Sequence, residues 1–284
     1  MTTPLVTITI PTYNSEKALK LCLDAIRKQT YKNIEINVID GASKDNTIKV
    51  ARKFNVKDIK TCKGSLLEAR YEGIKKAKGK YVLILDSDQI LNINSVERAV
   101  KQAEKNKMDM LAFEEIPYST ENFLEKLFDC DRKLINAIND FSPLTGVIMP
   151  RFFNTKILRK AYSNIPKGIY ANTGGPDHAV VYYEAWLLSK KIENLPNAVK
   201  HIEPNSIFTL IRKFYRWGYT SSDAHSGKYK FLMTQKERFR TGLFTKGLIV
   251  ESLGSILLLI LKGIPFEVGY LTAGIRKLFK KVNL

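Results

Sequence analysis

Cysteine is scarce in this sequence. The 284 residues contain three, Cys22, Cys62 and Cys130, which are widely separated and form no CxxC pair. An odd, scattered set argues against a disulfide framework and against a zinc site built on paired thiols. We therefore expect reduced thiols in a cytoplasmic protein. Residues 1–10 also lack the charged start, apolar stretch and cleavage site of a signal peptide, and they lead directly into an expected core strand.

Acidic residues are also few. Lysine and arginine number 46 against 28 aspartate and glutamate residues, so that the formal net charge is +18. A positive field of this size attracts nucleic acid, anionic lipid headgroups or phosphorylated substrates, and it also describes an ordinary basic surface. The basic residues are dispersed, and no helix-turn-helix, RNP or Cys/His module accompanies them. Charge alone would allow a nucleic-acid-binding or scaffold protein, but the motifs predict no nucleic-acid partner.

An uninterrupted apolar run of membrane-spanning length is missing as well. Two mostly apolar pieces, residues 247–261 and 264–275, are separated by Lys262 and Gly263. Neither reaches the roughly 20 residues that cross a bilayer unaided, so we expect residues 246–284 to form an apolar helical hairpin. The hairpin could simply pack on the soluble domain, but its breaks and its basic end favour a membrane-associated anchor. The basic end consists of Arg276, Lys277, Lys280 and Lys281.

Strand-like and helix-like segments alternate over the first part of the chain. Apolar runs rich in β-branched residues are followed by stretches whose apolar residues recur at helical spacing. The expected strands are residues 5–10, 34–39, 58–62 and 81–85, and the expected helices are residues 15–29, 45–54 and 65–77. This alternation predicts an α/β fold with a mostly parallel sheet flanked by helices. Ligands of such sheets bind at the carboxyl ends of the strands.

The regular alternation stops beyond Glu115. Further helices are expected near residues 120–137, 177–190 and 206–219, with short strands near residues 192–195 and 199–202. A polar, basic stretch then leads to the apolar C-terminal segment. We therefore divide the chain into a domain of residues 1–219 with halves 1–117 and 118–219, a basic connection of residues 220–245, and the apolar residues 246–284.

Asp86 and Asp88 follow the fourth expected strand. Two carboxylates at this spacing, where the chain leaves the sheet, can converge on one divalent cation. Mg²⁺ or Mn²⁺ typically binds through one or two carboxylates together with substrate phosphates. An isolated Asp-x-Asp is more often a solvated turn with capping carboxylates. Its position in the ligand crevice of a parallel sheet favours the metal site here.

Four segments of the sequence carry a family resemblance. The first is Pro11-Thr12-Tyr13-Asn14 and the second is residues 38–47. The third runs from Gly64 to Gly79 and includes Ala69-Arg70, Gly73 and Ala77. The fourth is Leu85-Asp86-Ser87-Asp88. In this order they are similar to the motifs of the inverting family 2 glycosyltransferases of the GT-A fold, which include Pro-x-Tyr-Asn and Leu-Asp-x-Asp. The resemblance covers roughly residues 6–218 and is that of an archaeal or bacterial membrane-associated member.

This resemblance implies a nucleotide-diphosphate sugar, UDP- or GDP-linked, as the donor substrate. It makes residues 1–117 the nucleotide-sugar-binding half and residues 118–219 the acceptor and catalytic half. Asp40 would accept a hydrogen bond from the nucleotide base, although Asp-Gly is also a common turn dipeptide. The other residues implied to contact the nucleotide are Pro11 and Tyr13, which would flank the base and ribose, and Arg70.

The resemblance also implies a Mg²⁺ or Mn²⁺ site at the Leu-Asp-x-Asp motif. Asp88 resembles the family's metal ligand and Asp86 the neighbouring acid that contacts the ribose, while Ser87 would contribute mainly its backbone. His201 is similar to a histidine that completes the metal shell in several members, so that Asp86, Asp88 and His201 are the expected ligands. A lone histidine at a strand end can equally be structural.

Inverting transfer needs a base that takes the proton of the acceptor hydroxyl. The family usually shows Glu-Asp at the start of a helix, and the corresponding residues here are Gly174-Gly175-Pro176-Asp177. The resemblance therefore makes Asp177 the base, while Pro176 replaces the usual glutamate and puts the role of that position in doubt. The alternative is that Asp177 is an acid favoured at a helix start by the helix dipole.

A basic, aromatic helix is expected over residues 206–219. Lys213-Phe214-Tyr215-Arg216-Trp217 is similar to the family's Gln-x-x-Arg-Trp, with lysine in place of glutamine. Guanidinium groups suit diphosphate oxygens, so the resemblance assigns donor binding to Arg212, Arg216 and Trp217. The same helix could also lie on a membrane surface, and the two interpretations are compatible.

The resemblance thus predicts a metal-dependent inverting glycosyltransferase that acts on an acceptor hydroxyl. The apolar C-terminal segment adds the expectation of a lipid-linked, polyprenyl acceptor at the cytoplasmic face of the cell membrane. An alternative is a polyprenyl-phosphate (dolichol-phosphate) sugar synthase, whose phosphate acceptor needs little help from a base. A non-enzymatic scaffold is disfavoured because the motif positions retain their acids, Asp40, Asp86, Asp88 and Asp177.

Overall fold

The computed structural model describes residues 3–138, 140–144, 148–170, 177–221, 228–229, 231–232 and 248–282. Most of the predicted connection 220–245 therefore lies outside the described residues. The strands are β1 (Val6–Thr12), β2 (Ile34–Asp40), β3 (Asp58–Thr61), β4 (Tyr81–Ile84), β5 (Gln89–Leu91), β6 (Met110–Pro117), β7 (Pro150–Asn154) and β8 (Ile192–His201). The helices are α1 (Glu16–Arg27), α2 (Thr47–Lys53), α3 (Leu66–Lys76), α4 (Ser95–Asn106), α5 (Phe123–Asn136), α6 (Thr155–Asn164), α7 (Lys167–Tyr170), α8 (Asp177–Leu188), α9 (Ile207–Ser221) and α11 (Ile249–Val282).

The strands form one eight-stranded sheet in the order β3-β2-β1-β4-β7-β6-β8-β5. β1 pairs in parallel with β2 and β4, and β2 pairs in parallel with β3. Beyond β4 the sheet is mixed, because β7 is antiparallel to both β4 and β6 while β6 is parallel to β8. A second antiparallel pair joins β5 to β8. The predicted α/β class is confirmed, and β7 comes from the part of the chain where the strand–helix alternation ends.

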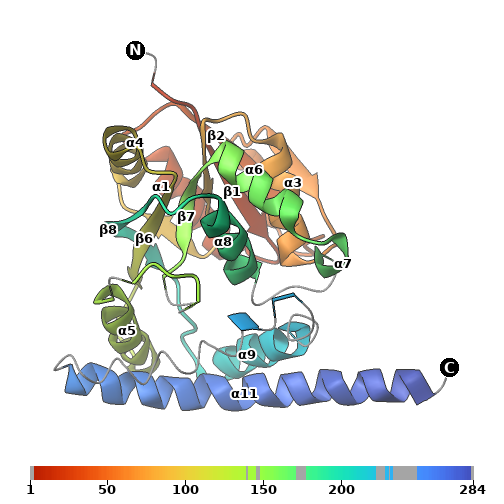
Figure 1. Cartoon of the computed structure of the whole chain (residues 1–284). Helices are drawn as coiled ribbons and strands as arrows, with labels where there is room; N and C mark the ends of the chain where they lie inside the picture. The colour runs from red at the N-terminus through yellow and green to blue at the C-terminus, as the bar shows by residue number, and fades with distance from the viewer. Residues whose placement is uncertain are drawn as a thin grey trace.

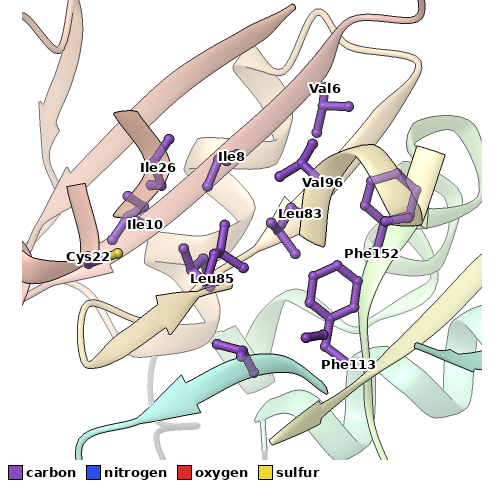
Figure 2. Packing of buried hydrophobic residues seen from close by; sticks show 14 of the residues in the cluster. Val6, Ile8, Ile10, Cys22, Ile26, Leu83, Leu85, Val96, Phe113 and Phe152 are labelled. Atoms are coloured by element: carbon purple, nitrogen blue, oxygen red, sulfur yellow. The ribbon is translucent and has the colours of Figure 1, made fainter. Parts of the chain in front are cut away.

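Two hydrophobic layers cover the faces of this sheet. Ile8 of β1 packs with Ile26 of α1 and Val96 of α4, and Figure 2 shows these side chains pointing toward one another. The opposite face carries a second cluster that includes Leu158 of α6 and Val180 of α8. Because helices occupy both faces, the carboxyl edge of β1, β2 and β4 is the part of the sheet left for a site.

A third layer lies beyond that edge. Helices α5, α9 and α11 occupy one end of the molecule, the bottom of Figure 1, with α11 running beneath the other two. Leu127 of α5, Leu210 of α9 and Leu258 of α11 belong to a separate hydrophobic cluster. The hydroxyl of Ser255 on α11 donates a hydrogen bond to Asp131 of α5 at 2.6 Å. The C-terminal helix is therefore attached to the rest of the protein by both apolar and polar contacts.

The predicted C-terminal hairpin is wrong, because α11 is a single helix that continues through Lys262 and Gly263 and contains Pro265. Contacts along its length explain why it does not break. Lys262 Nζ lies 3.2 Å from Asp131 Oδ2 of α5. At Gly218 of α9 a Cβ atom would lie 1.8 Å from a backbone oxygen of α11, so only glycine permits this approach. Ile249–Arg276 is, by length and composition alone, long and apolar enough to cross a membrane.

Candidate active site

A cavity of about 520 Å³ lies between the carboxyl edge of the sheet and the helices α5, α8 and α9. Loops that follow parallel strands converge at such an edge, which explains why motifs distant in sequence meet there. Two predicted residues, Asp40 and Arg212, do not line the cavity. The predicted residues that do are Pro11, Tyr13, Arg70, Asp86, Ser87, Asp88, Asp177, His201, Arg216 and Trp217.

Asp40 ends β2 with a fully buried side chain. Its Oδ1 accepts a hydrogen bond from the Ser43 hydroxyl at 2.5 Å, and its Oδ2 accepts one from the Ser43 backbone N–H at 2.9 Å. The next residue, Gly41, donates its N–H to the Thr12 carbonyl at 2.8 Å and so ties the ends of β1 and β2 together. These contacts are those expected of a turn-capping aspartate, which is the alternative interpretation of Asp40.

Asp86 is held by two arginines from different elements. Its Oδ1 accepts a hydrogen bond from Arg70 Nη2 at 2.6 Å, and its Oδ2 accepts one from Arg151 Nη1 at 2.9 Å. Burial by itself would raise the pKa of Asp86, but the guanidinium groups of Arg70 and Arg151 outweigh it and hold that pKa well below its ordinary value. Each carboxylate oxygen of Asp86 therefore carries one arginine hydrogen bond, which keeps Asp86 ionised and fixed in position.

Asp177 begins α8 and is 1% exposed. Arg70 Nη1 donates a hydrogen bond to its Oδ2 at 2.5 Å, so Arg70 bridges Asp177 and Asp86. Burial raises the pKa of Asp177 to about 6, against the attraction of Arg70 and with added repulsion from Asp86. Such a carboxylate is mostly ionised at neutral pH and still basic enough to accept a proton. The preceding Gly174-Gly175-Pro176 lies outside the described residues.

Asp88 and His201 form the other end of the site. His201 Nε2 lies 3.5 Å from Asp88 Oδ2, and His201 Nδ1 lies 3.1 Å from Glu203 Oε1. Although burial opposes protonation, Asp88 and Glu203 raise the pKa of His201, so this end of the cavity attracts positive charge. A metal-binding histidine is commonly oriented in this way by a carboxylate at its second nitrogen.

These residues fit a divalent cation that takes further ligands from a substrate. Within the described part of the chain, no group of three or more His, Cys, Asp or Glu side chains could hold a metal ion. Asp88 and His201 would therefore supply two ligands, and oxygens of a bound diphosphate would supply others. The predicted third protein ligand, Asp86, forms ion pairs with Arg70 and Arg151 in this structure, and its role as a metal ligand stays a prediction.

Sequence reasoning missed the charged residues that connect the two ends of the site. Arg151 Nη2 lies 3.0 Å from Glu115 Oε1, and Arg132 Nη1 lies 2.9 Å from Glu115 Oε2. Arg132 Nη2 then lies 2.9 Å from Glu203 Oε1. Negative and positive groups thus alternate from Asp177 to Asp88, which offsets the cost of burying each carboxylate. Glu203 could have been suspected from its place two residues after His201, but Glu115, Arg132 and Arg151 stand in no motif.

His178 is a further cavity residue without a sequence signal. Its Nε2 lies 2.7 Å from Arg151 Nη1. Burial, together with the nearby guanidinium groups of Arg70 and Arg151, lowers the pKa of His178 to about 3. The imidazole is therefore neutral at physiological pH, and its Nε2 accepts the hydrogen bond from Arg151.

Helix α9 closes the cavity on the side of the third layer. Lys213 Nζ lies 3.9 Å from Asp88 Oδ2 and 5.3 Å from the centre of the Trp217 ring. The rings of Phe214 and Trp217 meet edge to face with their centres 5.0 Å apart. Arg216 also lines the cavity, whereas Arg212 is exposed to solvent. The cavity thus combines cations near Asp88 with an aromatic wall, a chemistry that suits a phosphorylated ligand.

Residues 7–193 match the family described as Glycosyl transferase family 2, which is more than half of the chain. The chain belongs to glycosyltransferase family 2. One curated relative is the glycosyltransferase GlyG of Streptococcus pneumoniae, 35% identical over 113 residues that cover 38% of each protein. Another is the Escherichia coli UDP-Glc:alpha-D-GlcNAc-diphosphoundecaprenol beta-1,3-glucosyltransferase WfgD, 32% identical over 38% of this chain and 44% of the relative. The matched stretch is thus less than half the length of these family 2 relatives.

Solved structures with the same fold extend over most of this family 2 chain. The mannosyltransferase PcManGT of Pyrobaculum calidifontis, in complex with GDP-Man and Mn²⁺, has a TM-score of 0.54 at 17% identity and covers 99% of this chain and 82% of that chain. S. aureus TarS 1–349 in complex with UDP has a TM-score of 0.56 at 18% identity and covers 86% and 72%. The predicted GT-A fold is therefore confirmed.

Proposed function

We propose that this protein is an inverting glycosyltransferase that moves a sugar from a nucleotide-diphosphate sugar to an acceptor hydroxyl. One observation carries the proposal. A buried carboxylate with a raised pKa, Asp177, lines the same cavity as the Asp88–His201 pair that suits a cation. A base at one end and a diphosphate-binding group at the other are the two requirements of a single displacement at an anomeric carbon.

In this proposal Asp177 takes the proton of the acceptor hydroxyl. As that oxygen attacks the anomeric carbon, its proton passes to the Asp177 carboxylate and the bond from the sugar to the diphosphate breaks. The bonding electrons leave with the nucleoside diphosphate, and attack from the opposite side inverts the anomeric configuration. Arg70 orients the base through its 2.5 Å hydrogen bond, and Asp86 fixes Arg70 in turn.

The leaving diphosphate would lie at the opposite end of the cavity. Mg²⁺ or Mn²⁺ held by Asp88 and His201 would neutralise the charge that develops on the diphosphate. Lys213 and Arg216 of α9 line the same end and can contact diphosphate oxygens directly. The likeness of the fold to PcManGT, whose structure contains GDP-Man and Mn²⁺, supports a nucleotide sugar and a divalent cation as the ligands.

Two residues at the end of β1 are suited to the nucleotide. Pro11 and the half-exposed Tyr13 line the cavity at the end of β1 and offer apolar surface for a base and ribose. Asp40 would act indirectly: it caps the turn that contains Gly41, and Gly41 packs against Tyr13. We propose UDP or GDP as the nucleotide.

We further propose that the acceptor is a lipid-linked glycan at the cytoplasmic face of the cell membrane. The relative WfgD is named for an acceptor carried on diphosphoundecaprenol, which supports an acceptor of this class. The cavity wall formed by α5 and α9 includes Phe128, Ile135 and Phe214 beside Lys262. Apolar and cationic groups together suit a molecule with an apolar tail and an anionic head.

A polyprenyl-phosphate sugar synthase is the second candidate, favoured by the number of cations in the cavity. Arg132, Lys213, Arg216 and Lys262 all line it and could receive a phosphate acceptor. The two candidates differ in their need for a base, because an acceptor phosphate is already ionised. The Asp177→Asn variant separates them: transfer to a hydroxyl should fall by a factor on the order of 10² or more, as expected for a lost general base. Transfer to a phosphate should change little.

The donor is tested with UDP-, GDP- and dTDP-sugars in the presence of Mg²⁺ or Mn²⁺. We expect one nucleotide to bind in calorimetry only when the metal is present, and its sugar to be released slowly by hydrolysis. The Asp177→Asn variant should bind this donor as the wild-type protein does. Failure of every nucleotide sugar to bind would remove the proposed function, and undiminished transfer by Asp177→Asn to a hydroxyl acceptor would place the base elsewhere.

A further inference from the structure

The outward side of α11 carries a continuous apolar stripe. Its members recur every three or four residues, so they lie on one side of the helix. Each is between 39% and 63% exposed, which is unusual for leucine, isoleucine and valine side chains in such number. Members of the stripe are Leu253, Leu257, Ile260, Ile264, Val268 and Leu271.

Helix α9 lies on the inward side of α11 and also carries exposed apolar residues. It packs directly on α11, with Gly218 against Phe266, and Gly269 of α11 against the backbone of Tyr215. Ile211 and Tyr215 lie about two turns and one turn before Gly218 on α9, and both remain exposed. Figure 1 shows α9 lying along α11 at the end of the molecule away from α4. Helix α9 thus adds exposed apolar residues next to α11, while the continuous stripe belongs to α11 alone.

The inward side of α11 has the opposite character. Ser255 and Lys262 both contact Asp131 of α5, at 2.6 Å and 3.2 Å. Lys262 also lies near the middle of the apolar stretch Ile249–Arg276. If α11 crossed a bilayer, it would have to leave α5 and α9 and carry Lys262 into the hydrocarbon, which is costly for a charged group. A helix of this length is about 42 Å long, well beyond the roughly 30 Å of a hydrocarbon core.

We propose that the outward stripe of α11 is a docking surface on which the protein lies on an anionic bilayer, with α11 in the plane of the membrane. Charge selects this occupant over a second copy of the chain. The net charge of +18 makes two copies repel each other, whereas it attracts anionic headgroups. Arg212 of α9 and Arg276 of α11 are exposed and can reach those headgroups.

This inference rests on the proposed function and adds to it the orientation of the enzyme on the membrane. Lys262 lines the cavity from the inward side of α11, while the stripe is on the outward side of the same helix. One helix diameter, roughly 10 Å, therefore separates the cavity from the hydrocarbon. A lipid-linked acceptor would present its anionic head at the level of the cavity without leaving the bilayer.

The surface is tested by flotation of the full-length chain with vesicles of phosphatidylcholine, with or without phosphatidylglycerol. We expect the protein to float with the anionic vesicles. The double variant Ile260→Glu/Ile264→Glu, which changes only exposed positions of the stripe, should reduce the bound fraction tenfold or more. Ile93→Glu is the matched control, because Ile93 is 62% exposed and precedes α4, far from α11. Equal flotation of all three proteins would overturn the proposal, as would a full-length chain that never floats.

The in-plane orientation is tested with protease added outside sealed vesicles that carry the bound protein. A C-terminal tag should remain accessible, because an in-plane helix keeps both of its ends on the outer side. Protection of the tag would mean that α11 crosses the bilayer and would overturn this orientation. Sedimentation of the protein without vesicles tests whether a second copy of the chain binds the stripe instead. If the wild-type chain forms dimers and the stripe variant does not, the surface belongs to a second copy and the proposal is overturned. Binding of the nucleotide sugar is measured on the same samples, so failure to float with intact donor binding contradicts only this inference.

Discussion

Asp177 and Asp88 stand at opposite ends of one chain of alternating charges. Arg70 joins Asp177 to Asp86, and Arg151 continues from Asp86 toward Glu115. Each guanidinium is shared by two carboxylates, so no single acid is fully neutralised. This sharing explains how two neighbouring acids differ in proton affinity. Asp86, with two arginines, has a strongly lowered pKa, whereas Asp177 shares one arginine and keeps a pKa raised to about 6 by burial.

The raised pKa of Asp177 predicts how activity depends on pH. A general base must be ionised to accept a proton, so kcat/KM should rise with pH through about 6 and level off above it. Below that value Asp177 is protonated and the base is lost. The measurement is a kcat/KM profile for sugar transfer at saturating metal, with donor affinity determined at each pH as a control. A profile that stays flat across this range would contradict the assignment of Asp177.

The contact between Glu203 and His201 predicts an indirect effect on metal binding. Replacing Glu203 with Gln keeps the shape but removes the charge that orients and polarises His201. We expect Mn²⁺ to bind 10 to 100 times more weakly when a nucleoside diphosphate is present, the usual cost of losing such an outer partner. Asp88→Ala should cost at least as much, and Ser87→Ala should cost little. Calorimetric titration with Mn²⁺ measures all three. Unchanged affinity in the Glu203 variant would contradict its effect on His201, and unchanged affinity in the Asp88 variant would remove the metal site.

At the scale of elements, the contact between α9 and α11 depends on glycine. A Cβ atom at Gly269 would lie 2.1 Å from the Tyr215 carbonyl oxygen, while at Gly263 of the same helix it would meet nothing within 4 Å. Gly269→Ala should therefore lower the free energy of unfolding by about 1–3 kcal/mol, a typical cost of overpacking. Gly263→Ala should raise it slightly, because alanine favours the helix. Denaturant unfolding of both variants measures these changes. If both variants are stabilised equally, the helices do not touch at Gly269.

The first strands and helices could be predicted from the sequence to within two residues at each end, because their signal is local. Residues 81–85 were expected as a strand, for example, and β4 is Tyr81–Ile84. The later pairing could not be predicted, since β7 joins β4 only through contacts distant in sequence. Arg151 of β7 and Glu115 of β6 reach the site through that pairing. The site residues found from sequence are accordingly those that follow the early strands or stand in family motifs.

The hairpin prediction failed for a related reason. Lys262, Gly263 and Pro265 interrupt the apolar pattern and normally weaken a helix. In the folded protein Lys262 has a partner on α5, and the neighbouring turns are held against α9. Tertiary contacts thus stabilise a helix that its own sequence would end. Nothing in the local pattern of the chain reveals that α5 lies opposite Lys262.

At the scale of the whole molecule, three layers set the path of the reaction. The sheet supplies the carboxyl edge where Asp86 and Asp88 emerge, α5 and α9 complete the cavity, and α11 forms the base beneath them. Donor and acceptor would then arrive from different phases. In the proposed function a nucleotide sugar would enter from water past Tyr13, which is half exposed, whereas a lipid-linked acceptor would enter beside α9 and α11.

This arrangement predicts a strong preference for acceptors that share the membrane with the enzyme. Confinement of both partners to one surface raises the effective concentration of the acceptor without any new contact. On anionic vesicles, kcat/KM for a polyprenyl-diphosphate sugar should exceed that for a water-soluble analogue with the same sugar by tenfold or more. The Ile260→Glu/Ile264→Glu variant should lose this advantage while hydrolysing the donor at the wild-type rate, because the stripe lies outside the cavity. Equal rates with the two acceptors on vesicles that bind the enzyme would show that the membrane plays no part in acceptor choice, and the catalytic assignment of Asp177 would remain unaffected.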